Sequence, residues 1–107
     1  MTKKLPQLSE NGTRILVALS GRNLHGYGIM KQVDKDTQVR IPIGSLYRTI
    51  AKLLKDELIE ECHAPINADT EDERRKYYRN TTLGEHALDA QIARYRSIVS
   101  AAMNMRG

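Results

Sequence analysis

The stretch RIPIGSLYRTIAKLLKDELI, residues 40–59, decides the fold because it joins an apolar helical stripe to an unusually polar beginning. Leu46, Ile50 and Leu53 recur at helical spacing, which predicts one buried face. We expect the helix to begin near Pro42, since a proline costs little at the first helical position, where its missing N–H would have no partner within the helix. The opposite face would carry the polar side chains of Ser45, Arg48, Thr49, Lys52 and Lys55.

Two further helices are predicted before this one. Ile15 and Leu19 follow Glu10 at helical spacing, so a first helix is expected from about Glu10 to the turn residues after Leu19. In residues 24–37, LHGYGIMKQVDKDT, the apolar side chains again recur at helical spacing and predict a second helix. We interpret His25 as a cap or turn residue of this helix rather than as a catalytic group.

The apolar period changes after Leu58. Residues 58–66 and 74–82 are predicted strands on either side of a polar tip, residues 67–73, and together they make a hairpin. From Leu83 onward the sequence is helical again, and its apolar residues follow the 4-3-4-3 spacing of a coiled-coil seam. The seam consists of Leu88, Ile92, Tyr95, Val99 and Ala102.

Two kinds of partner would suit this seam. It could pack onto the chain's own core, but three helices and a hairpin already form a closed unit, so we expect a second copy of the chain to cover it. The predicted fold class is therefore mainly α with a small β hairpin (α+β). In that fold, a winged helix-turn-helix precedes a C-terminal dimerisation helix.

Composition narrows the class of protein. The net charge is +4, and residues 1–58 hold ten Lys and Arg against five Asp and Glu, an excess that suits a phosphate backbone or an anionic membrane. No apolar run approaches the roughly 20 residues that cross a bilayer, and no apolar stretch follows the basic N-terminus as in a signal peptide. The single cysteine, Cys62, excludes a disulfide framework within the chain, so we expect a soluble, cytoplasmic protein.

Catalytic and metal-binding motifs find no support in the sequence. Cys62 and His63 are adjacent, but a structural zinc site needs four ligands, and no second Cys or His stands at metal spacing. No arrangement of Ser, His and Asp, no phosphate loop and no paired carboxylate motif is visible either. We therefore expect no enzyme activity, no metal and no cofactor.

Three motifs in this order resemble the PadR family of bacterial transcriptional regulators: LHGYGIMKQV (24–33), IGSLYRTIAKLLKDELIEE (43–61) and RRKYYRNTTLGEHAL (74–88). The resemblance implies a homodimeric winged-helix repressor that binds double-stranded operator DNA, with the last helix forming the dimer. The single helix after the hairpin is similar to the compact branch of the family. The expected parts are a flexible N-terminal arm over 1–9, a winged helix-turn-helix DNA-binding domain over 10–82 and a dimerisation helix over 83–107.

The chain departs from the family pattern in three places. Pro42 and Ile43 stand where the family has Ser-Pro, so the capping serine of the recognition helix is gone. Glu57 replaces the glycine of the turn before the first wing strand, which removes a residue suited to the left-handed conformation. The wing tip is acidic, and we expect it to stay off the DNA because phosphate repels carboxylates. Its acidic residues are Asp69, Glu71, Asp72 and Glu73.

The polar beginning of the third helix is predicted to enter the major groove. Gly44 would let the backbone approach the DNA closely, and the first N–H groups of the helix would favour phosphate. Ser45 and Thr49 would meet base edges, while Arg48 would read guanine or hold a phosphate. The residues predicted to contact DNA are Tyr27, Lys31, Gly44, Ser45, Tyr47, Arg48, Thr49, Lys52, Arg74, Arg75 and Lys76.

Simpler interpretations of these residues remain open at this point. The polar face of the third helix could be an ordinary solvated surface, and Tyr47 could pack under the wing instead of reaching a phosphate. Arg75 and Lys76 should alternate between the two faces of a strand, and either could pair with the wing's own acids, at little gain in stability. The whole domain could be a protein-interaction adaptor with only non-specific affinity for DNA. An unknown small-molecule effector is compatible with a repressor, although this chain has no Trp for a flat aromatic drug pocket.

Overall fold

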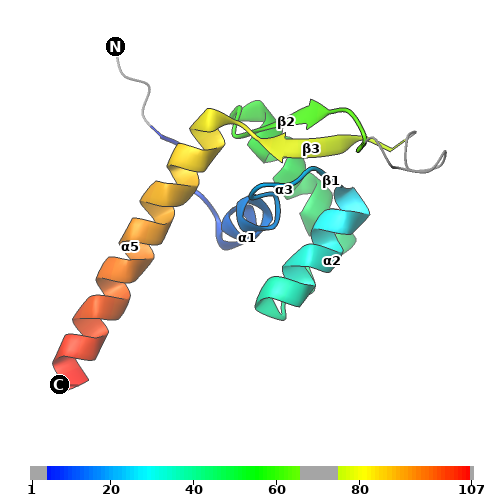
Figure 1. Ribbon diagram of the computed structural model, residues 1–107. Helices are drawn as coiled ribbons and strands as arrows, with labels where there is room; N and C mark the ends of the chain where they lie inside the picture. The colour runs from blue at the N-terminus through cyan, green and yellow to red at the C-terminus, as the bar shows by residue number, and fades with distance from the viewer. Residues whose placement is uncertain (1–4, 66–74, 107) are drawn as a thin grey trace, which may run out of the picture.

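A computed structural model describes residues 5–65 and 75–106 of the chain. Helices α1, α2 and α3 and a small sheet form one body, and α5 extends away from it (Figure 1). The predicted order of three helices, a hairpin and a long helix is confirmed. The elements are α1 (Glu10–Ala18), β1 (Leu24–His25), α2 (Gly26–Thr37), α3 (Ile43–Lys55), β2 (Ile59–Cys62), β3 (Tyr77–Asn80) and α5 (Thr82–Arg106).

The sheet has a third strand that sequence analysis did not predict. Its order is β1-β3-β2, and both pairs are antiparallel. Leu24 lies opposite Tyr78, and His25 lies opposite Tyr77, so residues that were assigned to the start of the second helix instead extend the wing's sheet. Among the described residues, the pairing of these two strands covers Ile59–Cys62 and Tyr77–Asn80, which is shorter than the predicted strands. β3 is therefore the central strand, covered by a neighbour on each edge.

An aliphatic core lies between the helices and the sheet. Leu46, Ile50 and Leu53 are all buried, which confirms the predicted apolar stripe of α3. Burial of such side chains is the main favourable contribution to folding. Leu8 also belongs to this core, although it falls in the predicted flexible arm. The other buried apolar residues are Ile15, Leu16, Ala18, Leu19, Ile29, Val33, Ile41, Leu58, Ile59, Tyr77, Tyr78, Ala87 and Leu88.

Side chains cap the first two helices but not the third. The Ser9 hydroxyl accepts a hydrogen bond from the Gly12 N–H at 2.9 Å, and His25 Nδ1 accepts one from the Gly28 N–H at 3.0 Å. His25 is thus the helix cap that the sequence predicted. At the start of α3, Pro42 makes no side-chain cap bond, as the missing serine suggested.

The turn between α3 and β2 depends on a left-handed residue that is not glycine. Glu57 has a φ of 62°, the conformation that the family's glycine would adopt without a Cβ penalty. Its carbonyl oxygen accepts a hydrogen bond from the Thr81 hydroxyl at 2.7 Å, which holds this turn against the start of α5. The backbone is therefore kept in a conformation that costs a glutamate free energy.

We expect Glu57→Gly to stabilise the fold by roughly 1 kcal/mol. Glycine adopts a positive φ without strain, and this gain exceeds the conformational freedom that glycine loses on folding. Thermal unfolding followed by circular dichroism should then show a melting temperature higher by a few degrees. Lys55→Gly, at the exposed end of α3, is the control and should lower it, since glycine is a poor helix former. A lower melting temperature for Glu57→Gly would contradict the strain at this turn.

Candidate nucleic-acid interface

The first turns of α3 present polar groups on the surface. The Thr49 hydroxyl donates to the Ser45 carbonyl at 2.7 Å, and Arg48 Nη2 donates to the Ser45 hydroxyl at 3.2 Å. Gly44 and Arg48 are exposed, whereas Ser45 and Thr49 are half-buried. Because no side chain caps this helix end, its first N–H groups remain available to a ligand.

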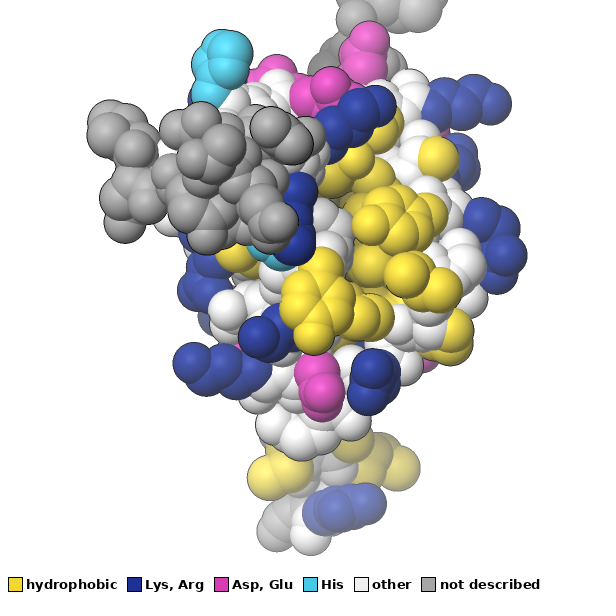
Figure 2. Space-filling view, turned by 90° about the vertical axis from the view of Figure 1, so that its right-hand side faces the viewer, with side chains coloured by type: hydrophobic (Ala, Val, Ile, Leu, Met, Phe, Trp, Pro, Cys, Tyr) yellow, Lys and Arg dark blue, Asp and Glu magenta, His cyan; other side chains and the backbone are white. Residues whose placement is uncertain are grey.

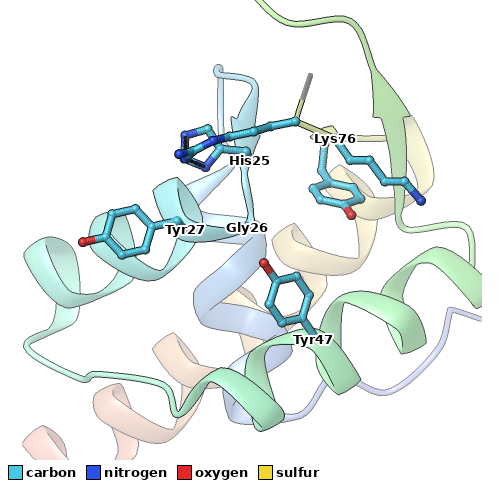
Figure 3. Close-up of a pocket in the computed structure, with 7 residues that line it drawn as sticks. His25, Gly26, Tyr27, Tyr47 and Lys76 are labelled. Carbon is cyan, nitrogen blue, oxygen red and sulfur yellow. Dashed lines mark hydrogen bonds between the residues drawn. The ribbon is translucent and has the colours of Figure 1, made fainter. Parts of the chain in front are cut away.

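A recess of about 570 Å³ separates the start of α3 from the start of α2 and the base of the wing (Figure 3). The Tyr47 ring extends from α3 towards Gly26, the first residue of α2. A Cβ at position 26 would lie 2.7 Å from the Tyr47 hydroxyl oxygen and 3.1 Å from its ring carbons, so a larger residue there would require the ring to move. Tyr47 is thus held between two elements of the surface while half of it stays exposed. The recess is lined by His25, Gly26, Tyr27, Tyr47, Arg75, Lys76 and Tyr78.

Cationic side chains surround this recess. Lys31 lies over the Tyr27 ring, with its Nζ 5.5 Å from the ring centroid. Arg75 contacts the His25 imidazole, with Nη1 3.2 Å from Nε2. Two of the other cations that the sequence predicted to contact DNA are paired with acids. These pairs are Lys76 with Glu61 at 3.6 Å and Lys52 with Asp56 at 2.9 Å.

The paired lysines remain available to phosphate. Lys52 and Lys76 keep most of their side-chain surface exposed, and exposed ion pairs contribute at most about 1 kcal/mol. The acids that pair with them, Asp56 and Glu61, lie at the C-terminal end of α3 and on β2. Because these pairs are weak, a strongly charged phosphate backbone can replace them.

The acidic wing tip and Arg74 lie outside the described residues. The prediction that the tip stays off the DNA therefore stays a prediction.

The base of the wing consists of two cations followed by two tyrosines, and Arg75 lies beside His25 whereas Lys76 pairs with Glu61. Arg75 and Lys76 are both exposed, and Tyr77 and Tyr78 are both buried. The reason is that β3 begins only at Tyr77, so the two cations precede the pleated strand. Tyr77 is covered by the His25 ring, which meets it edge-on with centroids 5.3 Å apart. Both cations are thus left on the surface that borders the recess.

Burial raises the pKa of two ionisable groups of the wing. It raises the pKa of the Tyr78 phenol, and the Glu61 carboxylate raises this pKa further, so the hydroxyl at the recess stays a hydrogen-bond donor. Burial also raises the pKa of the Cys62 thiol, against the opposite influence of Arg79. A thiol that stays protonated is a poor nucleophile and a poor metal ligand.

Within residues 5–65 and 75–106, no three His, Cys, Asp or Glu side chains come close enough together to hold a metal ion. None of the helices in these ranges is long and apolar enough to cross a membrane.

The right-hand side of Figure 1, turned to the viewer in Figure 2, combines apolar and cationic side chains. Apolar side chains gather near the middle of this face, and Lys and Arg lie around them. At the starts of α2 and α3, the exposed large apolar residues are Tyr27, Ile43 and Tyr47. Sequence analysis missed Ile43, because an isoleucine next to a helical stripe is normally assigned to the core. It also missed the contact of His25 with Arg75, which are far apart in the sequence.

The predicted dimer seam on α5 divides into two parts. Leu88 is buried in its own chain and Ile92 packs partly against the same core. Beyond them, Tyr95, Val99 and Ala102 are exposed. The large apolar side chains Ile98, Met103 and Met105 are exposed as well. The role of these residues in a dimer stays a prediction, and an apolar surface on a projecting helix is what such an interface needs.

Comparison with known proteins gives a family and several similar folds. The transcriptional regulator PadR-like family matches residues 15–90. A PadR family transcription regulator from Clostridium difficile is 23% identical with a TM-score of 0.78, over 92% of this chain and 100% of that chain. A PadR-like transcriptional regulator from Bacillus cereus is 23% identical with a TM-score of 0.73, over 88% of both chains. A transcriptional regulator from Clostridium thermocellum is 24% identical with a TM-score of 0.70, over 92% and 96%. No curated protein matches the chain in sequence.

Proposed function

We propose that this chain, which belongs to the PadR-like family of transcriptional regulators, is a dimeric repressor of a specific operator. The winged-helix fold of this family binds DNA and is generally non-enzymatic. Each subunit would insert the first turns of α3 into a major groove of duplex DNA. The wing base and the start of α2 would lie along the flanking phosphates. The exposed half of α5 would pair with that of a second copy.

The observation that carries this proposal is the composition of one continuous surface. The exposed tyrosines Tyr27 and Tyr47 and the wing-base cations Arg75 and Lys76 line one recess, and the uncapped start of α3 lies one helical turn before Tyr47. Free N–H groups and cations suit phosphate, whereas Ser45, Thr49 and Arg48 carry the hydrogen-bonding groups that read base edges. Such a surface supports both the affinity and the sequence preference of a regulator.

Selection of bound duplexes from a random pool tests the proposal most directly. We expect enrichment of an inverted repeat whose half-sites are about one helical turn, ~34 Å, apart. Binding to the enriched site should weaken steeply as salt rises, because released counterions accompany each phosphate contact. If random competitor DNA at physiological salt removes the protein from every enriched sequence, the adaptor interpretation of the domain is correct instead.

Arg48→Ala should weaken binding to the selected site by about 10-fold or more, the value of one bidentate contact to a base. Its melting temperature should stay unchanged, since the side chain is exposed and bonds to its neighbour Ser45. Gel shifts on wild-type and variant protein measure the loss.

Arg48→Lys is the matched variant that separates the two roles of this residue. It keeps the charge but not the planar fork that reads guanine, so a phosphate contact would survive and base discrimination would not. Unchanged affinity and unchanged discrimination in Arg48→Ala would remove this residue from the interface.

A further inference from the structure

Helix α5 leaves the body of the protein at a buried polar residue. Gly84, Ala87, Leu88 and Gln91 are buried, whereas every described residue from Ala93 onward is exposed. The side chain at the exit is therefore an amide, not an aliphatic group. Gln91 is only 7% exposed, and the residue that it meets on α1, Thr13, is equally buried.

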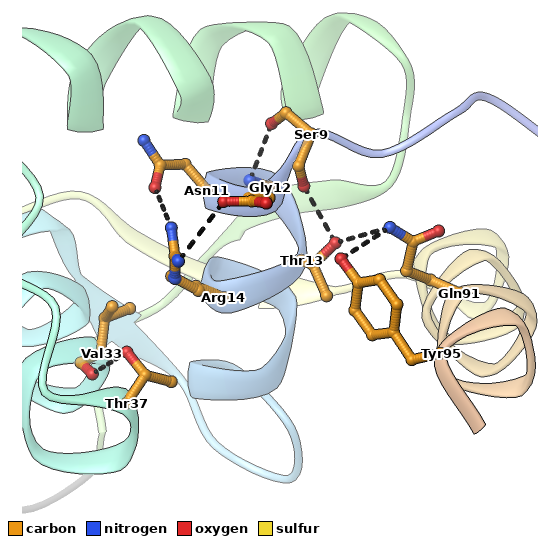
Figure 4. A network of polar contacts seen from close by, with 10 residues as sticks. Ser9, Asn11, Gly12, Thr13, Arg14, Val33, Thr37, Gln91 and Tyr95 are labelled. Carbon is orange, nitrogen blue, oxygen red and sulfur yellow. Dashed lines mark hydrogen bonds and ion pairs between the residues drawn. The ribbon is translucent and has the colours of Figure 1, made fainter. Parts of the chain in front are cut away.

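The Gln91 amide is fully engaged in hydrogen bonds (Figure 4). Its Nε2 donates to the Thr13 hydroxyl at 3.4 Å and to the Tyr95 hydroxyl at 3.1 Å. Its Oε1 accepts from the Arg94 guanidinium, with Nε at 3.0 Å. Thr13 in turn donates its hydroxyl hydrogen to the Ser9 carbonyl at 2.9 Å, so the network continues into the N-terminal end of α1.

These hydrogen bonds favour one orientation of α5 relative to α1 more strongly than apolar packing alone would. An aliphatic contact tolerates small rotations, whereas a buried amide that loses a partner is left unsatisfied. The bond to Thr13 ties α5 to α1, and α1 packs directly against α3, where Gly12 faces Leu53. Within this network, the Gln91–Thr13 hydrogen bond is the one that joins α5 to α1, at the point where the projecting helix leaves the body.

We propose that Gln91 is a positioning residue that sets the separation of the two DNA half-sites accepted by the dimer. This inference rests on the proposed function. Fifteen residues separate Gln91 from the end of α5 at Arg106, so the exposed part is about 22 Å long. A tilt of about 10° at Gln91 displaces the far end by about 4 Å, which is close to the ~3.4 Å between base pairs. A small change of angle therefore shifts the half-site register by about one base pair.

The test compares operators whose half-site separation changes in steps of one base pair, built from the sequence selected by the wild-type protein. Wild type should prefer one separation by about tenfold or more over its neighbours. Gln91→Leu, which keeps the size of the side chain but not its hydrogen bonds, should reduce this preference to within about threefold or move it by one base pair. Its affinity for a duplex with a single half-site should stay at the wild-type value.

Two further variants separate the effect of the lost hydrogen bonds from the effect of changed packing. Leu83→Met is the matched control, because it changes a partly buried side chain at the start of α5, outside the predicted seam, and should keep the wild-type preference. Thr13→Val removes the partner hydroxyl with little change of shape and should behave like Gln91→Leu. It therefore tests the same contact if Gln91→Leu does not fold.

The results distinguish a failure of the proposed function from a failure of the inference about Gln91. If wild type selects no paired half-sites, the proposed function itself fails. If wild type shows a spacing preference and the folded Gln91→Leu and Thr13→Val variants retain it unchanged, the inference about Gln91 alone is overturned.

Discussion

Gly84→Ala is expected to unfold the protein or to lower its stability by about 3 kcal/mol or more, a large part of the 5–15 kcal/mol that a domain typically has. A Cβ at this position would overlap the Leu58 carbonyl oxygen and lie 2.9 Å from the carbonyl carbon. The obstacle is backbone, so no side-chain rotation relieves it. Circular dichroism during heating, together with the soluble yield, measures the loss.

Hydrogen bonds prevent the helix from moving away from this clash. The Gly84 N–H donates to the Thr81 hydroxyl at 2.9 Å, and the Thr81 N–H donates to the same Leu58 carbonyl at 3.1 Å. Thr81 also donates its hydroxyl hydrogen to the carbonyl of Glu57, so the start of α5 is bound to the turn before β2 at two points. Alanine at position 84 would have to break this set of contacts.

Gly44→Ala is the matched control for Gly84→Ala. The nearest atom to a Cβ at position 44 would be Arg48 Nη1 at 3.6 Å, an ordinary contact, and alanine favours a helix by up to about 1 kcal/mol. This variant should therefore melt at the same temperature as wild type or slightly higher. A melting temperature of Gly84→Ala that matched wild type would show that α5 can move away from β2.

Val99→Asp is expected to convert the protein to monomers and to reduce operator affinity by at least about 100-fold. Val99 is 59% exposed on the projecting half of α5, between Tyr95 and Ala102 in the exposed part of the predicted seam. A carboxylate at a position that faces another apolar helix would be desolvated without a partner. Loss of the dimer removes the joint binding of two half-sites, which is worth a factor of 10²–10⁴.

Light scattering measures the mass of the Val99→Asp variant, and gel shifts measure its affinity. Ser100→Asp is the control, because it places the same charge on the neighbouring exposed residue, outside the 4-3-4-3 pattern. It should remain a dimer. A Val99→Asp protein that dimerises as wild type does would exclude the seam as the interface.

The sequence predicted the parts of the fold that depend on periodicity and on local chemistry. The stripe of α3 is buried as expected because Leu46, Ile50 and Leu53 repeat at helical spacing. The cap at His25 and the strained turn at Glu57 were predictable because each depends on one residue and its immediate neighbours.

The features that were missed depend on contacts between distant segments. β1 is only two residues long and has no period of its own, so its pairing with β3 is visible only in the folded chain. For the same reason Arg75, which lies beside His25, could be predicted as a cation near DNA but not as a neighbour of the α2 cap. Nothing in the residues around Gln91 indicated its burial, because its partner Thr13 lies on another helix.

The close fit of Gly26 and Tyr47 links two positions that would otherwise evolve and be engineered separately. Any side chain larger than glycine at position 26 would displace the ring that α3 carries into the recess. A change of DNA preference could therefore arise from a substitution on α2 that never touches a base. Libraries designed to give this regulator a new operator should accordingly vary positions 26 and 47 as a pair.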